Sequence, residues 1–470
     1  MAQMNRILHH LSQAFQAMPA SLPARTMADL LITLLFLKVA SEYWQEQSVT
    51  MRHAAKSQEE FDHAMRLHAP VLMNEQCLFD VCLAADAAQC GATVRHVLSL
   101  LEAIQPDTRL NEVLQPQRFG FLDGYMQATR AHNPLSDALL HLAQIRMADV
   151  VPVLTPSLAL GNAFAAAMVS LYCGPGSAIR DCTQWLATIL KPASGETVFD
   201  PACEQGHLLL ACANELQLRH PGARLALTGL EGDQRKWAMA TMLMQLSGVS
   251  ARIDHQEALK TALPYQTRRE LAPADIVLTL IPDKRYPWSH ALARTEMQSR
   301  FPLRPPIDNR LALFWHGLAS MKADTGRMGI LISPAALSGH EGAALVRYLV
   351  EHNLLDAVIN LPPPARAEHG PLPLALILRQ QRGHSRIALI SRHSPGSQGE
   401  SPAGPYQGSQ IVAAYGAHQQ GASHPYLRSI EPGALLRHHD GLGGLGELGL
   451  QSFLADLAND IDMAEQRMGV

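Results

Sequence analysis

The sequence predicts an α/β protein in which a doubly wound, mostly parallel sheet follows a helical N-terminal domain and precedes a C-terminal helical tail. Residues 1 to about 160 contain long stretches rich in Ala, Leu, Met, Gln and His, with few strand-like runs. From about residue 197, short apolar runs alternate with helical segments, the pattern of parallel strands joined by helical crossovers. We therefore expect three domains, over residues 1–160, 161–395 and 396–470.

The clearest helix of the N-terminal region is ADLLITLLFLKVASEYW, residues 28–44. Apolar residues occupy most of its positions, which predicts a helix buried on all sides within a helical domain. Its longest apolar run, residues 30–37, is far shorter than the roughly 20 residues that a membrane span needs. The N-terminus lacks a signal-peptide pattern, so no membrane association is predicted.

Seven strand-like runs predict the sheet, and helical stretches such as GHLLLACANELQL and QRKWAMATMLMQLSG separate them. The runs are TVFD (197–200), LALTGLE (225–231), SARID (250–254), DIVLTLI (275–281), MGILISP (328–334), LLDAVINLP (354–362) and LALILRQ (374–380). A stretch rich in Gly, Ser, Pro and Gln, residues 394–425, is predicted to be a loose connection.

Charge and cysteine usage exclude several functional classes. The formal net charge of −4 gives no global basic field for nucleic acid, although a local patch or a basic partner could supply one. The seven cysteines are scattered and lack CxxC spacing, which indicates reduced, buried thiols in a cytoplasmic protein. The 22 histidines are dispersed and predict no shared role. The run Arg-His-His-Asp at 437–440 fits a solvated turn, so no metal site is predicted.

Two acids stand at the ends of neighbouring predicted strands. Asp200 ends the first strand and is followed by a turn and a helix, the place where α/β proteins bring backbone against a nucleotide. Glu231 ends the second strand, where such sheets place the carboxylate that holds a ribose hydroxyl. An exposed acid in an ordinary turn is the simpler reading of either residue alone, but together they indicate a nucleotide-type cofactor crevice.

The order of these segments resembles the modification subunits of type I restriction-modification systems, which are N6-adenine DNA methyltransferases that use S-adenosylmethionine. The first loop of that family reads Asp-Pro-Ala-Cys-Gly-Ser-Gly, and the matching loop here is Asp-Pro-Ala-Cys-Glu-Gln-Gly, residues 200–206. The similarity runs over nearly the whole chain, in collinear order. The resemblance implies a class I methyltransferase-like sheet. It also implies weak or vestigial cofactor contacts at Asp200, Pro201, Cys203, Gly206, Glu231 and Glu257.

The chain departs from the family where its cofactor binds. Glu204 adds bulk and charge where the family has glycine, and His207 stands where a further glycine is usual. Upstream, the family's Phe-Tyr-Thr-Pro is replaced by Tyr-Cys-Gly-Pro at residues 172–175, which lacks the threonine hydroxyl. The resemblance therefore implies that S-adenosylmethionine binding is weak or lost.

A second departure follows the fourth strand. The family ends this strand with Asn-Pro-Pro-Phe, in which an Asn oxygen and a Pro carbonyl accept hydrogen bonds from the flipped adenine and the ring stacks on the base. The corresponding residues here are Leu280, Ile281, Pro282 and Asp283. Leucine accepts no hydrogen bond and aspartate cannot stack, so the target amine loses its orientation. No intact catalytic set is predicted.

The C-terminal segment 450–468 is predicted to be an amphipathic helix. Its apolar residues fall on about one face, since their offsets follow the 3.6-residue period: Leu450, Leu454, Leu457, Ile461 and Met468. In the resembling family this region meets the specificity subunit. We therefore expect a specificity-type subunit or a second modification-type chain as partner, with DNA as a further candidate, while packing of the helix on its own domain stays open.

Three functions remain open on the sequence. The protein is a catalytically silent member of the adenine-N6 methyltransferase family kept for assembly or for binding DNA or a partner, an active methyltransferase with different loops, or an interaction scaffold that has lost both cofactor and DNA. Whether the chain is an enzyme is therefore undecided by the sequence. Cofactor binding separates the second function from the other two.

Overall fold

The computed structural model describes residues 2–18, 22–68, 71–104, 114, 119, 122, 133–145, 156–173, 179–259, 273–281, 308–337, 339–360, 374–391 and 408–437. These residues form two compact units. The helical unit comprises residues 1–177, 204–210 and 233–253, and the sheet unit comprises residues 178–203, 211–232 and 254–470. Among the described residues, no helix combines the length and the apolar character needed to cross a membrane.

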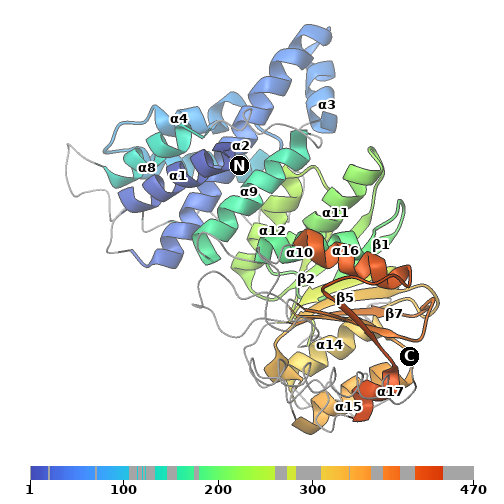
Figure 1. Ribbon diagram of the computed structural model, residues 1–470. Helices are drawn as coiled ribbons and strands as arrows, with labels where there is room; N and C mark the ends of the chain where they lie inside the picture. Colours follow the sequence, from blue (N-terminus) through green and yellow to red (C-terminus); the bar gives the residue numbers. More distant parts are fainter. Residues whose placement is uncertain are drawn as a thin grey trace. The chain divides into compact units, whose positions relative to one another are not determined.

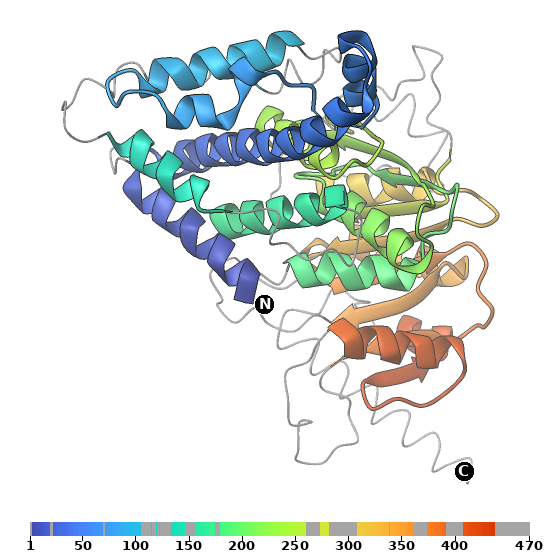
Figure 2. The ribbon, with the colours of Figure 1, turned by 90° about the horizontal axis from the view of Figure 1, so that it is seen from above.

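The helical unit is organised around one long helix, α2 (Ala24–Ala54), which packs against α1, α8 and α9 (Figure 2). Residues Met27 to Ser41 of α2 are all buried, which confirms the buried helix predicted at 28–44. Its helices are α1 (Ala2–Ala17), α2, α3 (Gln58–His68), η1 (Glu75–Cys77), α4 (Phe79–Leu83), α5 (Cys90–Ile104), α8 (Pro134–Ala143), α9 (Pro156–Cys173) and α12 (Gln234–Leu246).

Charges that α2 buries are paired, as the low dielectric of an interior requires. The Asp29 carboxylate lies 3.2 Å from Arg235 Nε on α12, and Lys38 pairs with Glu42 one turn away. Close helix packing in this unit depends on Gly161 of α9, where an added Cβ would lie 1.8 Å from Ser247 Oγ. The helical unit therefore tolerates no side chain at that position without rearrangement.

The sheet has nine strands in the order β3-β2-β1-β4-β5-β7-β6-β8-β9. The strands are β1 (Thr197–Asp200), β2 (Ala226–Glu231), β3 (Ala251–His255), β4 (Ile276–Leu280), β5 (Arg327–Ile332), β6 (Leu355–Asn360), β7 (Leu374–Arg379), β8 (Ile387–Ile390) and β9 (Leu427–Ile430). The first seven of these coincide with the seven predicted runs to within about two residues.

Strand directions divide the sheet into two parts. β2, β1, β4 and β5 pair in parallel, whereas β7 enters antiparallel between β5 and β6. β6 pairs in parallel with β8, and β8 pairs antiparallel with β9. The carboxyl ends of β1, β2 and β4 consequently share one edge of the sheet, where a nucleotide-type cofactor would bind.

Helices cover both faces of the sheet, as the doubly wound prediction requires. α14 (Asn309–Ala319), α15 (Gly339–Glu351) and α17 (Pro432–Arg437) lie on one face, and α10 (Ile179–Leu190) and α16 (Gly408–Gln419) lie on the other (Figure 1). The remaining elements of this region are α11 (His207–Arg219) and η6 (Pro334–Ala336). Apolar side chains of α14 and α15 form one continuous core with β4, β5, β6 and β7.

The structure differs from the sequence prediction over residues 408–437. This part of the predicted loose connection and tail holds α16, β9 and α17. Its Gly- and Gln-rich composition disfavours regular structure, but α16 buries Ile411, Ala414, Tyr415 and His418, and this tertiary burial outweighs the local propensity. The predicted helix at 450–468 lies outside the described residues.

Candidate functional site

The loop that follows β1 keeps the shape of a ligand-binding turn. β1 ends at Asp200, which is fully buried, and the Asp200 Oδ1 atom accepts a 3.0 Å hydrogen bond from the backbone amide of Ala202. The amide of Cys203 donates a 2.9 Å bond to the carbonyl of Leu230 at the end of β2. The loop is therefore hydrogen-bonded to the neighbouring strand end.

Two residues of the loop have left-handed backbone, which glycine adopts without a steric cost. Gly206 has a φ of 83°, and an added Cβ there would lie 3.0 Å from Met244 Cε, so glycine is required. Glu204 has a φ of 48° although it carries a side chain. Left-handed backbone at such a residue costs roughly 1–2 kcal/mol. Glu204 is thus held in a conformation that suits the glycine expected from the family resemblance.

The Glu204 side chain is held by a partner. Its Oε1 atom lies 2.6 Å from Nζ of Lys236 on α12, and both side chains are about one third exposed, 31% and 34%. The next residues of the loop also interact locally: His207 Nε2 lies 3.1 Å from Gln205 Oε1, and Gln205 Nε2 contacts Met239 Sδ at 3.6 Å. The loop therefore presents a charged pair where the family has small residues.

The structure brings together the acids predicted at the end of β2 and after β3. Glu231 is buried, and its backbone carbonyl accepts a 2.9 Å bond from the amide of Gln256. A Cβ added to Gly232 would lie 2.9 Å from Glu257 Cβ, so the two backbones approach within contact distance. The backbone segments that carry Glu231 and Glu257 therefore lie side by side, and ribose and adenine contacts by these acids stay a prediction.

The end of β4 is apolar. Leu280 is half-buried, and Ile281 is 3% exposed within the core that α14 covers. The Ile281 amide donates a 2.8 Å bond to the Leu331 carbonyl, which continues the pairing of β4 with β5. Neither side chain offers a hydrogen-bond acceptor. Pro282 and Asp283 lie outside the described residues, so their geometry stays a prediction from the sequence.

The other predicted contacts are only partly described. Pro201 follows Asp200 in the turn and is buried, and Cys203 is 4% exposed. Residues 172 and 173 end α9, whereas residues 174 and 175 lie outside the described part of the chain. Six cysteines of the described part of the chain are free thiols, and burial raises the pKa of the Cys82 thiol to about 12. The Cys82 thiol is therefore protonated near neutral pH.

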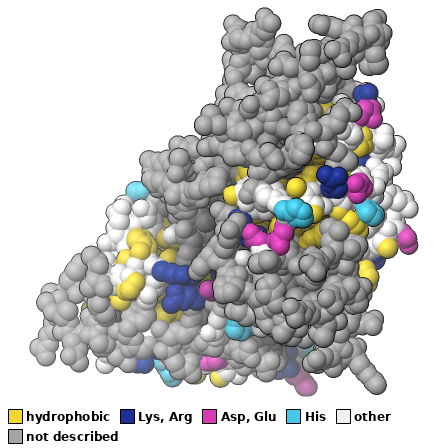
Figure 3. All heavy atoms as spheres, turned by 90° about the horizontal axis from the view of Figure 1, so that it is seen from below, with side chains coloured by type: hydrophobic (Ala, Val, Ile, Leu, Met, Phe, Trp, Pro, Cys, Tyr) yellow, Lys and Arg dark blue, Asp and Glu magenta, His cyan; other side chains and the backbone are white. Residues whose placement is uncertain are grey.

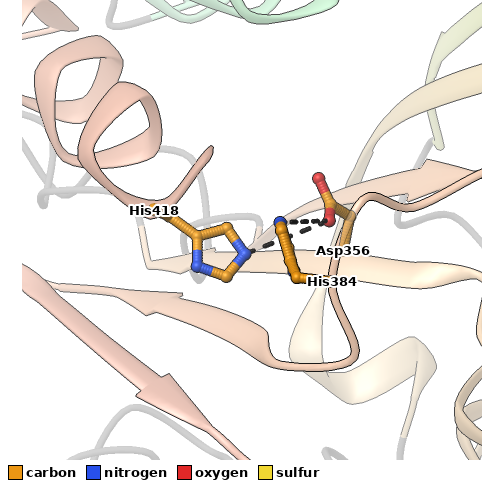
Figure 4. Close-up of side chains that lie close together, drawn as sticks. All are labelled: Asp356, His384 and His418. Carbon is orange, nitrogen blue, oxygen red and sulfur yellow. Dashed lines mark ion pairs between the residues drawn. The ribbon is translucent and has the colours of Figure 1, made fainter. Parts of the chain in front are cut away.

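Sequence analysis missed a second polar cluster, which lies elsewhere on the sheet. Asp356 of β6, His384 of the β7–β8 turn and His418 of α16 point toward one another (Figure 4). One signal was present in the sequence, because Asp356 interrupts an otherwise apolar strand. Nothing in the sequence indicated which histidines would meet it. Asp356 stands at the amino end of β6, and β6 runs parallel to β5, so this cluster lies at the sheet edge opposite the cofactor loop.

The protein has the fold of class I S-adenosylmethionine-dependent methyltransferases. Three features indicate it: the strand order, the helices on both faces of the sheet, and the acids at the ends of β1 and β2. Within that class, residues 178–398 match the family model of the N-6 DNA methylases. This segment is therefore similar to the N-6 DNA methylases.

Solved structures extend the likeness to the whole chain. The methyltransferase subunit of a type I restriction-modification system from Streptococcus thermophilus is 15% identical, with a TM-score of 0.71 over 94% of this chain and 98% of that chain. A modification subunit from Vibrio vulnificus YJ016 is 14% identical, with a TM-score of 0.60 over 92% and 93%. At such identities the likeness concerns the fold, which is that of type I modification subunits. No curated protein matches the sequence.

Proposed function

We propose that this protein is a modification-subunit-like member of the N-6 DNA methylase family that transfers no methyl group and acts as a DNA- or partner-binding component of an assembly. The observation that carries the proposal is the apolar end of β4, where Leu280 and Ile281 replace a hydrogen-bonding pair. Adenine-N6 transfer depends on orienting an exocyclic amine, and a site without acceptors cannot supply that orientation.

Ile281 strengthens this argument because its side chain is part of the core. It is 3% exposed among the apolar residues that α14 covers. A polar group at this position would lose those contacts and would need new hydrogen bonds. The apolar end of β4 is thus integrated into the packing of the sheet, and one substitution at Leu280 does not rebuild a base-binding site.

The cofactor loop carries a second, independent obstacle. Asp200, Gly206, Glu231 and Glu257 fit the family cofactor, but Glu204 does not. Glu204 brings a carboxylate to the part of the loop where backbone must approach the ligand, and the ion pair with Lys236 restrains it there. S-Adenosylmethionine therefore does not fit the loop as it stands, and we assign no catalytic step that uses it.

Assembly is the function that remains. A solved structure with a TM-score of 0.60 and 16% identity, covering 98% of this chain and 96% of that chain, concerns complex assembly and conformational transition of a type I system. By analogy, the partner is a specificity-type subunit or a second modification-type chain, which docks on the predicted helix 450–468. Figure 3 shows basic and acidic side chains interspersed among the described residues on the face seen from below.

Calorimetric titration with S-adenosylmethionine tests the proposal, together with tritiated methyl transfer to mixed-sequence DNA. We expect no resolvable binding and no transfer by the wild type, and no transfer by Leu280→Asn, because two defects act on one reaction. Ligand stabilisation requires a concentration well above the dissociation constant, so thermal shift at millimolar cofactor should be close to zero.

Variants at Glu204 identify the obstacle. Glu204→Gly removes both the side chain and the backbone penalty, whereas Glu204→Gln removes only the charge. We expect Glu204→Gly to bind the cofactor at least about tenfold more tightly than Glu204→Gln, which corresponds to about 1.4 kcal/mol. Micromolar binding by the wild type, with methyl transfer that Asp200→Ala abolishes, would establish the alternative, an active adenine-N6 methyltransferase.

A further inference from the structure

The cluster at the edge opposite the cofactor loop joins three elements of the sheet unit. His384 Nε2 lies 3.8 Å and His418 Nε2 lies 4.0 Å from Asp356 Oδ1. One ligand atom from each of the three residues lies within 4.8 Å of the other two. Ligand atoms around a tetrahedral Zn²⁺ are roughly 3.4 Å apart, since each lies about 2.0–2.1 Å from the ion. The three donors are therefore close to the spacing that one such ion requires.

The carboxylate is positioned by an irregularity of β6. The register of β6 against β7 shifts between Leu355 and Ala357, so Asp356 stands at a β-bulge. A bulge redirects the side chain of the extra residue and is common where a strand carries a functional group. The Asp356 side chain is 0% exposed. A buried carboxylate at this position requires partners, and several elements supply them.

Hydrogen bonds at the outer nitrogens orient both imidazoles. His384 Nδ1 lies 3.0 Å from the Arg386 carbonyl, which can only accept, so Nδ1 carries the proton, and the lone pair of Nε2 lies 3.4 Å from Gln419 Nε2, whose long contact an ion would replace. His418 Nδ1 lies 3.1 Å from Ser429 Oγ, while its Nε2 is buried and has no hydrogen-bond partner among the described residues. Outer bonds of this kind fix the inward nitrogen of metal-binding histidines.

His418 is neutral at physiological pH. Burial, followed by the proximity of His384, lowers the pKa of His418 from 6.5 to about 4. Its buried Nε2 is oriented toward Asp356 (Figure 4). The His384 side chain is 25% exposed, which gives an ion a route from solvent to the cluster.

Two arginines beside Asp356 repel any cation that binds there, and this repulsion restricts which metal ion can bind. Arg382 Nε lies 3.3 Å from Asp356 Oδ1, and Arg379 Nε lies 3.3 Å from Oδ2. Oδ2 also accepts bonds of 2.5 Å from Tyr415 and 3.1 Å from Gln419, so Oδ1 is the less occupied oxygen. A nearby guanidinium weakens any cation site, and hard ions such as Mg²⁺ and Ca²⁺ depend on carboxylates.

Arg382 has neutral hydrogen-bond acceptors on its other side, in addition to the carboxylate of Asp356. Its Nη1 donates a 2.7 Å bond to Asn353 Oδ1, and its Nη2 donates to the carbonyls of Ser385 at 3.1 Å and Arg386. Arg382 can therefore give up the long contact with Asp356 and keep its remaining acceptors. The two imidazole nitrogens would then supply most of the affinity for the metal ion. Imidazole favours transition-metal ions such as Zn²⁺ over Mg²⁺ and Ca²⁺.

We propose that Asp356, His384 and His418 bind one divalent transition-metal ion, of which Zn²⁺ is the representative, with water completing its coordination. The ion links β6, the β7–β8 turn and α16, three elements that are separate in sequence. It acts as a structural clamp on this end of the sheet. The site is independent of methyl transfer, because it lies at the opposite sheet edge.

Metal titration of the untagged full chain, stripped with a chelator and dialysed at pH 7.5, tests the proposal. We expect one Zn²⁺ per chain with a dissociation constant in about the micromolar range. The metal should also raise the melting temperature. His384→Ala should weaken binding by at least about 30-fold, within the range expected for a lost metal ligand. His384→Gln, which keeps a polar side chain at the turn, serves as a second variant should the alanine form fold poorly.

Controls separate this site from adventitious binding at other histidines. His352→Ala removes an exposed ring that stacks on Tyr348, and binding should be unchanged. Co²⁺ should give intense visible absorption bands, typical of low coordination number, in the wild type and in His352→Ala but not in His384→Ala. Absence of stoichiometric Zn²⁺ binding, or binding that His384→Ala leaves intact, would overturn the proposal.

Discussion

Acidification from pH 7.5 to 5 should destabilise the sheet unit through the buried imidazole of His418. The folded protein holds this imidazole neutral, with its pKa lowered from 6.5 to about 4 by burial and by His384. In the unfolded chain the pKa returns to 6.5. Below pH 6.5 the unfolded state therefore binds a proton at His418 that the folded state does not bind. Because of this difference, the free energy of unfolding falls as the pH is lowered, until the pH reaches about 4.

The magnitude follows from proton linkage. Each pH unit over which the unfolded state binds one extra proton is worth about 1.4 kcal/mol. The window from pH 6.5 to 4 is thus worth about 3 kcal/mol in total, and the change from pH 7.5 to 5 about 2 kcal/mol. His418 is 4% exposed, so solvent screening is small. Asp356, His384 and Arg382 face it, and their charges are included in its shifted pKa.

Urea denaturation in the presence of a chelator, at half-unit intervals from pH 7.5 to 4.5, measures this effect. The comparison is with His418→Gln, which keeps a hydrogen-bonding side chain but binds no proton. Titrating groups away from this cluster contribute equally to both proteins, so the difference between the two curves reports His418 together with its coupling to His384 and Asp356. A wild-type curve that runs parallel to the variant over this range would refute the reasoning.

Two further substitutions test the packing of each unit. Asp356→Ala should lower the free energy of unfolding by about 3–5 kcal/mol, because it leaves the Arg382 side chain, which is 0% exposed, without its counter-charge. Urea denaturation at pH 7.5 with chelator present measures this loss, and a loss below about 1 kcal/mol would contradict the reasoning. Gly161→Val should cost at least about 1–3 kcal/mol, since its Cβ would overlap Ser247 Oγ at 1.8 Å. Gly416→Ala is the matched control: nothing lies within 4 Å of its Cβ, so this change in a helix should stabilise slightly, and equal losses in both glycine variants would exclude overlap as the cause.

Local sequence determined most of the fold. Continuous apolar runs such as TVFD and DIVLTLI predict buried strands because both faces of a doubly wound sheet are covered. β9 was not predicted because the two central residues of its LRSI sequence are polar and only half-buried, so it has no strand-like apolar run, and β8 was not predicted either. α16 escaped for a related reason, since tertiary burial stabilises it rather than its composition.

The departures from the motifs of the resembling family could be identified in the sequence because they are local substitutions within contiguous motifs. Glu204 and Leu280 each occupy one position of a short segment whose strand and turn are set by neighbouring residues. The tertiary structure added what spacing could not give: the left-handed backbone at Glu204, its pairing with Lys236, and the burial of Ile281 in the core. These features depend on the packing of α12 and α14.

The cluster around Asp356 was decided by the tertiary structure alone. Its aspartate, turn histidine and helical histidine belong to three elements, and no periodicity relates their positions in the chain. They meet because β7 inserts antiparallel between β5 and β6, which brings the β7–β8 turn to the amino end of β6, while α16 packs on β8 and β9. Sequence patterns report local periodicity and burial, whereas the convergence of distant side chains depends on strand order and direction, which long-range pairing determines.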